Sequence, residues 1–263
     1  MRSSILCAAL SALFYAAQSA AATTTVPVTP HDSYSSSVGV LGCKINTNRV
    51  AYWPIAIDCN NICVSLSYSG RSVYLLRIDR SGGAHDVSYD AWNYLITGKS
   101  ASSDPTAGGA VDMETENVDV SKCASLINTS GSALPLSAAN SMNYLNMCLE
   151  EKAAGNDSWV ADNYILYNIM DPICTYGHDE KCALTDWPAQ NQASCPHILG
   201  DPVSLTSDPV YNIRYPTGEK VLAGSSVSSS SSSPSTSDSS TSAGSPSFAF
   251  FQPLLLLSII SIL

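Results

Sequence analysis

The side chains with the widest chemical range in this chain are its cysteines and the histidines near them. Cys7 lies in the apolar leader, and eight further cysteines follow: Cys43, Cys59, Cys63, Cys123, Cys148, Cys174, Cys182 and Cys195. The last three alternate with His178 and His197, which raises the question of a zinc site. An even number of cysteines in a secreted chain instead favours disulfides. We therefore expect four disulfides and no metal, with their pairing left open.

A run of acidic residues is the second candidate for chemistry. Asp112, Glu114, Glu116 and Asp119 alternate with other residues and could offer oxygen ligands to a hard cation such as calcium. The run lacks the glycine and the ligand order of a calcium loop, so it predicts a solvated edge strand. Nucleophile-elbow, zinc-protease, P-loop and dinucleotide motifs are absent from the sequence. We expect no cofactor.

The elements that must position these residues follow from hydrophobic periodicity and turn signals. Strands are predicted at 50–53, 64–68, 73–78, 164–169 and 210–215, with a turn at Ser69-Gly70 joining the second and third. Helices are predicted at 89–96, after Ser88, and at 138–153, where Ala138, Met142, Leu145 and Leu149 form one apolar stripe. The chain is therefore mainly β, with a long loop over 97–111.

One stretch of this pattern resembles a known module. A hairpin beginning at Cys63-Val64 leads to Asp79, a Gly82-Gly83 loop, Asp86-Val87-Ser88 and a short helix. This order resembles the double-psi β-barrel of barwin, expansins, family-45 endoglucanases and RlpA-type proteins, and residues 48–53 are loosely similar to its first strand. The likeness covers about 42–98. It implies a double-psi β-barrel-like core, followed by a Cys-rich extension with one or two helices.

The resemblance also implies site residues. The carboxylate of the Asp-aliphatic-Ser segment is the general acid in the endoglucanases, so Asp86 is the candidate acid, with Asp79 or Asp58 as a second carboxylate. Tyr52 and Trp53 are candidates for stacking on sugar rings. Asp86 could instead hold its loop through backbone hydrogen bonds, and Asp79 could form a turn. Expansins loosen wall polysaccharide without evident hydrolysis, so the resemblance leaves catalysis open.

Both ends of the chain have the pattern of a targeting signal. Residues 1–22 are typical of a secretory signal peptide, 23–37 of a flexible amino terminus, and 38–220 form the folded head. Residues 221–247 are Ser-rich and predict an O-glycosylated stalk, and the apolar tail 248–263 is typical of a GPI-attachment signal. Ser237, Asp238, Ser239 and Ser242 are the candidate attachment residues, and Asn128 and Asn156 begin N-glycosylation sequons. This layout resembles fungal GPI-anchored cell-surface proteins.

The net charge limits the classes of partner that the chain can bind. Lys and Arg number 12 against 22 Asp and Glu, for a formal net charge of −10. A nucleic-acid partner needs clustered cations and is excluded. The expected partners are cell-wall polysaccharide and, through the GPI lipid, the membrane. The sequence favours a cell-surface glycoprotein that binds or remodels wall polysaccharide without strong catalysis. A glycoside hydrolase or transglycosylase using Asp86, and a structural or adhesive glycoprotein, are the alternatives.

Overall fold

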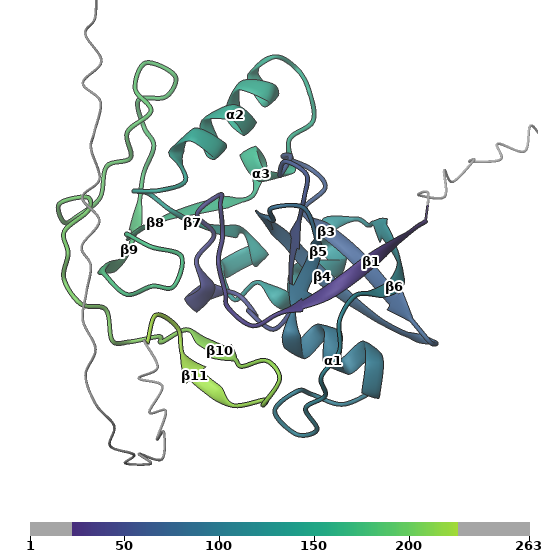
Figure 1. Cartoon of the computed structure of the whole chain (residues 1–263). Coiled ribbons are helices and arrows are strands. Elements are labelled where there is room, and N and C mark those ends of the chain that lie inside the picture. The colour runs from purple at the N-terminus through teal and green to yellow at the C-terminus, as the bar shows by residue number, and fades with distance from the viewer. Residues whose placement is uncertain (1–22, 226–263) are drawn as a thin grey trace, which may run out of the picture. The chain divides into compact units, whose positions relative to one another are not determined.

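The computed structural model describes residues 23–225 of the chain (Figure 1). The predicted signal peptide, most of the predicted stalk, the candidate attachment residues and the apolar tail lie outside these residues. The folded head continues past the predicted boundary at residue 220, because Lys220–Leu222 forms a strand. Residues 221 and 222, predicted as the start of the stalk, belong to this strand.

Six strands close into a barrel in the order β1-β5-β2-β4-β3-β6. Their bounds are β1 Thr24–His31, β2 Val50–Trp53, β3 Cys63–Tyr68, β4 Arg71–Arg80, β5 His85–Ser88 and β6 Val111–Asn117. Two neighbouring pairs, β1 with β5 and β2 with β4, run parallel, and the other pairs run antiparallel. The predicted barrel-like core is confirmed.

Strand β1 corrects the expectation of a flexible amino terminus over 23–37. It pairs parallel with β5 and antiparallel with β6, so it closes the barrel between strands far away in the sequence. Val28 is fully buried in the barrel interior, and the Thr- and Val-rich composition suits a strand. The threonines and two valines of this segment show too weak an alternation of polar and apolar residues to predict the strand from sequence.

The hairpin of β3 and β4 forms as predicted. Ser69 and Gly70 both have positive φ angles, 49° and 76°, which is the backbone of a tight two-residue hairpin turn. The apolar side chains of the two strands alternate into the barrel, where Leu66 and Leu75 are fully buried. Together with Val28 and Met113 of β1 and β6 they fill the barrel interior.

Helix α1, Tyr89–Thr97, follows β5 and packs on the barrel. Ser88 lies at its predicted N-cap position, but the Ser88 hydroxyl bonds the backbone of Val50 on β2 instead of the helix. The other end stops at Gly98, whose φ of 83° is left-handed. Arg71 from the β3–β4 turn donates to the last carbonyl groups, those of Leu95 and Ile96, at 2.8 and 2.9 Å.

The extension contains two small sheets and two helices. Strands β7 Leu134–Ser137, β8 Tyr164–Ile169 and β9 Gly177–Cys182 form one sheet, and β10 Tyr211–Ile213 pairs with β11 Lys220–Leu222. Helix α2, Met142–Ala153, begins four residues later than predicted, because residues 134–137 continue β7 and the chain turns before the helix. Helix α3 is Trp159–Asp162, and short 3₁₀ turns lie at Gly42–Lys44, Val120–Leu126 and Ser130–Ser132.

All eight cysteines described above form disulfides, as predicted. The pairs are Cys43–Cys174, Cys59–Cys148, Cys63–Cys123 and Cys182–Cys195. The first three join the part of the chain that builds the barrel to residues beyond β6, and the fourth lies within the extension. One apolar core accordingly spans the outer side of the barrel and the extension, where Leu76 of β4 and Leu166 of β8 are buried.

Candidate functional site

The resemblance-derived residues lie side by side on the outer face of the barrel. Register pairs place three of them, Asp86, Tyr52 and Asp79, in one row across β5, β2 and β4, and Thr29 of β1 extends the row beside Asp86. Asp79 and Asp86 are therefore two strand spacings apart, about 10 Å between backbones. The register therefore places the two carboxylates on one face, with Tyr52 between them.

Asp86 is the more accessible of the two carboxylates. It is half-buried, and the Thr29 hydroxyl donates a short hydrogen bond to its Oδ1. Its neighbour His85 points to the opposite face and packs edge-on against Trp53, with ring centroids 5.3 Å apart. Burial lowers the pKa of His85, which keeps that ring neutral near neutral pH. Asp86 thus has the exposure that chemistry requires, with a hydroxyl as its nearest polar partner.

Asp79 has a different environment. It is only 7% exposed and accepts three hydrogen bonds, from the Ser35 hydroxyl, the Ser37 backbone N–H at 2.8 Å and the Arg80 backbone N–H at 2.7 Å. Both carboxylate oxygens are used in these bonds. Asp79 holds residues 35–37 against the end of β4, so the geometry favours a structural role over a groove carboxylate.

Tyr52 and Trp53 correct the prediction of sugar-stacking aromatics. Both are buried, at 4% and 5% exposure. Alternation along β2 was expected to expose one of them, but this strand is covered on both faces. Trp53 points into the barrel core, and Tyr52 lies on the outer side against His31, with ring centroids 4.6 Å apart. Burial, and then the charges of Asp79 and Asp86, raise the pKa of the Tyr52 phenol far above its usual range.

Asp58, the other candidate second carboxylate, belongs to a loop. It accepts backbone N–H bonds from Asn60 and Asn61 and pairs with Arg77 at 2.9 Å. Arg77 is buried at 2% exposure and requires such a partner. Partial burial would raise the pKa of Asp58, but the Asn61 and Asn60 bonds and the Arg77 charge outweigh it and lower that pKa. The loop position and these bonds give Asp58 a structural role.

The hollow next to this row is too small for a sugar. It is bounded by His31, Tyr34, Tyr52, Tyr89 and neighbouring residues and has a volume of about 10 Å³. Such a volume holds about one water molecule. The residues of the row can therefore contact a large ligand only through the half-buried carboxylate of Asp86 and its rim.

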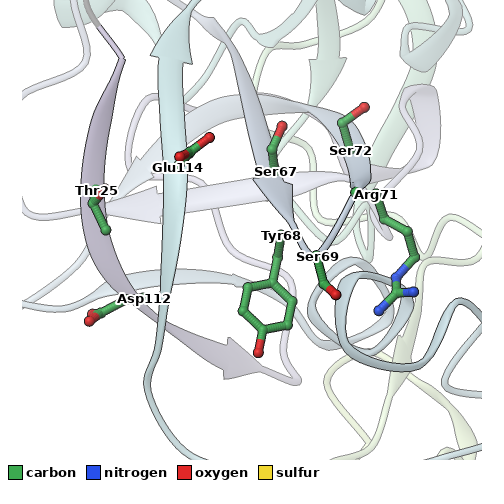
Figure 2. Close-up of a pocket in the computed structure, with 9 residues that line it drawn as sticks. Thr25, Ser67, Tyr68, Ser69, Arg71, Ser72, Asp112 and Glu114 are labelled. Atoms are coloured by element: carbon green, nitrogen blue, oxygen red, sulfur yellow. The ribbon is translucent and has the colours of Figure 1, made fainter.

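A larger hollow lies on the opposite side of the barrel and was not anticipated. An open groove of about 610 Å³ runs over β1, β6, β3 and the β3–β4 turn (Figure 2). Register pairs again form a row, here Thr25, Glu114, Ser67 and Ser72 across β1, β6, β3 and β4. Tyr68 and Asp112 line the same groove.

A second row extends this surface. Glu116, Ser65 and Tyr74 are paired across β6, β3 and β4, two residues along from the first row on the same face. Tyr74 is 42% exposed, and the Ser65 hydroxyl lies 3.4 Å from Glu116 Oε1. We call the two rows together the hydroxyl face: Thr25, Ser65, Ser67, Ser72, Tyr74, Glu114 and Glu116. It combines hydroxyl donors and acceptors, two carboxylates and one exposed ring.

The hydroxyl face also corrects the interpretation of the acidic run. The first three residues of the run lie on a strand, β6, while Asp119 follows it and accepts a hydrogen bond from the Ser121 backbone N–H. Strand β6 pairs with β1 on one side and β3 on the other, so it is not an edge. Met113 and Thr115 point inward and are buried, while Asp112 and Glu114 are exposed. Within residues 23–225, no lysine or arginine lies within 4.0 Å of the carboxylates of Asp112 or Glu114. The alternation therefore reflects one buried and one open face of a barrel strand.

Other predicted features fall on the surface of the described residues. The sequon asparagines Asn128 and Asn156 are both exposed. Among residues 23–225, no set of three His, Cys, Asp or Glu side chains is arranged to hold a metal ion. In the same part of the chain, no helix has the length and hydrophobicity needed to cross a membrane.

Comparisons with known proteins give partial likenesses. No protein-family model and no curated protein matches the chain. The solution structure of the fungal elicitor cerato-platanin matches 37% of this chain and 96% of its own length, with 21% identity and a TM-score of 0.28. The crystal structure of cerato-platanin 3 from M. perniciosa matches 38% and 98%, with 16% identity and a TM-score of 0.28. The closed barrel and its side chains, rather than these likenesses, carry the functional argument.

Proposed function

We propose that the chain is a secreted surface glycoprotein that binds cell-wall polysaccharide without catalysis, through the hydroxyl face of its barrel. The observation that carries this proposal is the groove of about 610 Å³ over that face. Polysaccharides present closely spaced hydroxyl groups, which carboxylates such as Glu114 and serine hydroxyls can bind directly. The exposed ring of Tyr74 beside them offers a flat apolar surface to one face of a pyranose.

The arrangement of the carboxylates supports a role without catalysis. Inverting hydrolysis needs an acid and a base about 6.5–9.5 Å apart, with room for a water molecule between them. Asp86 is available, but Asp79 is buried and accepts three hydrogen bonds, and the buried Tyr52 fills the space between them. In this row Asp86 is the single open carboxylate, and it cannot supply both roles in that scheme.

The location of the protein is part of the same proposal. The signal peptide at 1–22, the Ser-rich segment and the apolar tail 248–263 support GPI attachment at the cell surface, with the lipid at one of Ser237, Asp238, Ser239 or Ser242. N-glycans on the exposed Asn128 and Asn156 would lie outside the hydroxyl face, since both residues follow β6 in the extension. A stalk would hold the head in reach of the wall.

The test is a pull-down of the detergent-solubilised full chain with insoluble β-glucan, chitin and cellulose. We expect retention on at least one polymer, and we expect Tyr74→Ala and Glu114→Gln to reduce it by about tenfold or more, as loss of a central contact of about 1–2 kcal/mol does. Tyr176→Ala removes an equally exposed tyrosine from the extension, 44% exposed, and is the matched control. Equal losses in all three variants, or no retention on any polymer, would contradict the proposal.

A further inference from the structure

Four aspartates of this chain are followed directly by proline. The bonds are Asp104–Pro105, Asp171–Pro172, Asp201–Pro202 and Asp208–Pro209. An Asp–Pro bond is the peptide bond most easily cleaved in acid, because the side-chain carboxylate can attack its own carbonyl carbon to close a five-membered ring. The proline nitrogen is also a tertiary amide nitrogen that accepts a proton readily. Whether a folded protein accelerates such cleavage depends on what surrounds the bond.

Asp201 has the surroundings that this reaction needs. His178 Nε2 lies 3.0 Å from Asp201 Oδ2, so an imidazole ring is within hydrogen-bond distance of the carboxylate that would attack. On the other side, the backbone N–H of Val203 donates to the carbonyl oxygen of Asp201 at 2.9 Å. This bond spans Pro202 as a three-residue turn, and it polarises the carbonyl that would be attacked.

The histidine is held in place by a second pair. The rings of His178 and His197 are stacked, with centroids 4.1 Å apart and planes 8° from parallel. His197 Nδ1 lies 2.6 Å from Glu180 Oε2, and Glu180 also accepts from Asn168 at 2.9 Å. Burial would raise the pKa of Glu180, but the bonds from His197 and Asn168 outweigh it and lower that pKa to about 2. Glu180 is thus an anion at every pH at which the histidines carry charge.

The charged groups around His178 are therefore Asp201, His197 and Glu180, and its chain neighbour Asp179 is paired with Lys44 at 2.6 Å. An open hollow of about 390 Å³ is lined by both histidines and by Val203. Water can reach the bond from this side.

The other three Asp–Pro bonds lack this arrangement. Asp171 is engaged by the backbone N–H groups of Thr175 and Tyr176. Asp104 pairs with Lys99 at 3.1 Å, and Asp208 pairs with Lys44 at 3.3 Å. Neither a lysine ammonium nor a backbone amide is a proton donor suited to mild acid. Of the four aspartates, which all lie in residues 23–225, Asp201 is the one bonded to a histidine.

We propose that the Asp201–Pro202 bond is self-cleaving in mild acid, with Asp201 as nucleophile and His178 as general acid. A carboxylate oxygen of Asp201 forms a bond to its own carbonyl carbon, and the C–N bond to Pro202 breaks. The His178 proton passes to the proline nitrogen, which leaves as a secondary amine. One water then opens the resulting cyclic anhydride to a carboxyl-terminal Asp201, so atoms and charge balance without any oxidant or cofactor.

The disulfide map gives this step a consequence. All four disulfides lie before residue 201, the last ending at Cys195, so none crosses the cut. The segment from Pro202 onward would be held by non-covalent contacts alone, such as the buried side chains of Val210 and Ile213. Under the proposed GPI attachment, cleavage converts a covalent link between head and lipid into a dissociable one.

The experiment incubates the detergent-solubilised full chain at pH 5 and at pH 7.4 and follows fragments on reducing gels and by intact mass. We expect one new carboxyl terminus at Asp201 and one new amino terminus at Pro202. Cleavage at this bond should be about a hundredfold faster than at Asp208–Pro209 in the same molecules, within the usual range for general acid catalysis. When the chain is unfolded by denaturant at pH 5, the two bonds should be cleaved at the same rate.

Variants separate the mechanism from simple acid lability. Asp201→Glu keeps the charge but requires a six-membered ring, and His178→Gln keeps a hydrogen-bond donor but cannot release a proton. Both should slow cleavage at least tenfold, while Asp208→Glu, the matched control, leaves it unchanged. Equal rates at all four bonds, equal rates in folded and unfolded chain, or full activity in His178→Gln would overturn the proposal. Polysaccharide retention, measured separately, reports on the proposed function and not on this step.

Discussion

Replacing Asp79 gives the sharpest test of how the two carboxylates of the barrel face differ. Asp79→Asn keeps the shape of the side chain but replaces one acceptor oxygen with an NH₂ donor. In one orientation this NH₂ faces the Ser35 hydroxyl, and in the other it faces the backbone N–H groups of Ser37 and Arg80. Hydrogen bonds to a charged group contribute about 1.5–3 kcal/mol each. Ser35 and Ser37 are exposed and regain water when released, so the loss is close to one such bond rather than three.

We therefore expect Asp79→Asn to lower the free energy of unfolding by about 3 kcal/mol. For a domain of this size that corresponds to a fall in Tm of roughly 6–12 °C. Asp86→Asn leaves an amide oxygen that can still accept from Thr29 and removes only the charge on this bond, at a half-buried position, so it should cost about 1 kcal/mol. The measurement is urea denaturation of both variants with disulfides intact. An Asp86 variant that is as unstable as the Asp79 variant, or an Asp79 variant with unchanged stability, would refute the assignment of Asp79 as the structural carboxylate.

Three further predictions follow from the disulfides, the acidic groups and the tail. Removing the Cys43–Cys174 pair, 131 residues apart, should destabilise the head by about 2 kcal/mol more than removing Cys182–Cys195, 13 apart, in thermal unfolding of the two double-alanine variants. The pKa of Glu180 is lowered to about 2 from an ordinary 4.5, so its contribution to stability is present above pH 4.5 and is lost as the pH falls towards 2. Glu180→Gln should lack this acid dependence when the free energy of unfolding is measured against pH. The same pH dependence in wild type and variant would contradict the prediction. Deleting Phe248–Leu263 should release the protein into the medium, and phosphatidylinositol-specific phospholipase should release the full-length form; retention after both treatments would contradict GPI attachment.

The parts of the fold that could be predicted are those with strong local signals. The β3–β4 hairpin has alternating side chains on both strands and a Ser-Gly turn, and helix α1 ends at a glycine. Strand β1 was missed because its partners, β5 and β6, are more than fifty residues away and its own pattern of threonines and valines is weak. Its strand character depends on pairing within the barrel rather than on local propensity.

The candidate site could likewise be predicted only in part from the sequence. The sequence pattern put Asp79 near the end of a strand, which β4 confirms, and the register places Asp79 and Asp86 on one face with β2 between their strands. It could not predict that residues 35–37 fold over Asp79, or that Tyr52 and Trp53 are covered on both faces of β2. The hydroxyl face was missed because its members come from four strands, and only the closed barrel places Glu114 between Thr25 and Ser67. The alternation of β6 was the one signal that could have indicated it.

The distribution of covalent and non-covalent links determines how the head would respond to a pull from the stalk. Cys195 is the last disulfide-bonded residue, so load entering at residue 225 reaches β10 and β11 before any covalent cross-link. That hairpin is tied to the barrel side by the Tyr34 N–H bond to Asn212 and by the Tyr215 N–H bond to Asp32, besides buried apolar side chains. Such contacts open one after another, whereas the three disulfides that join the barrel to the extension do not. Under load the terminal hairpin would therefore detach first, and the barrel with its hydroxyl face would stay folded.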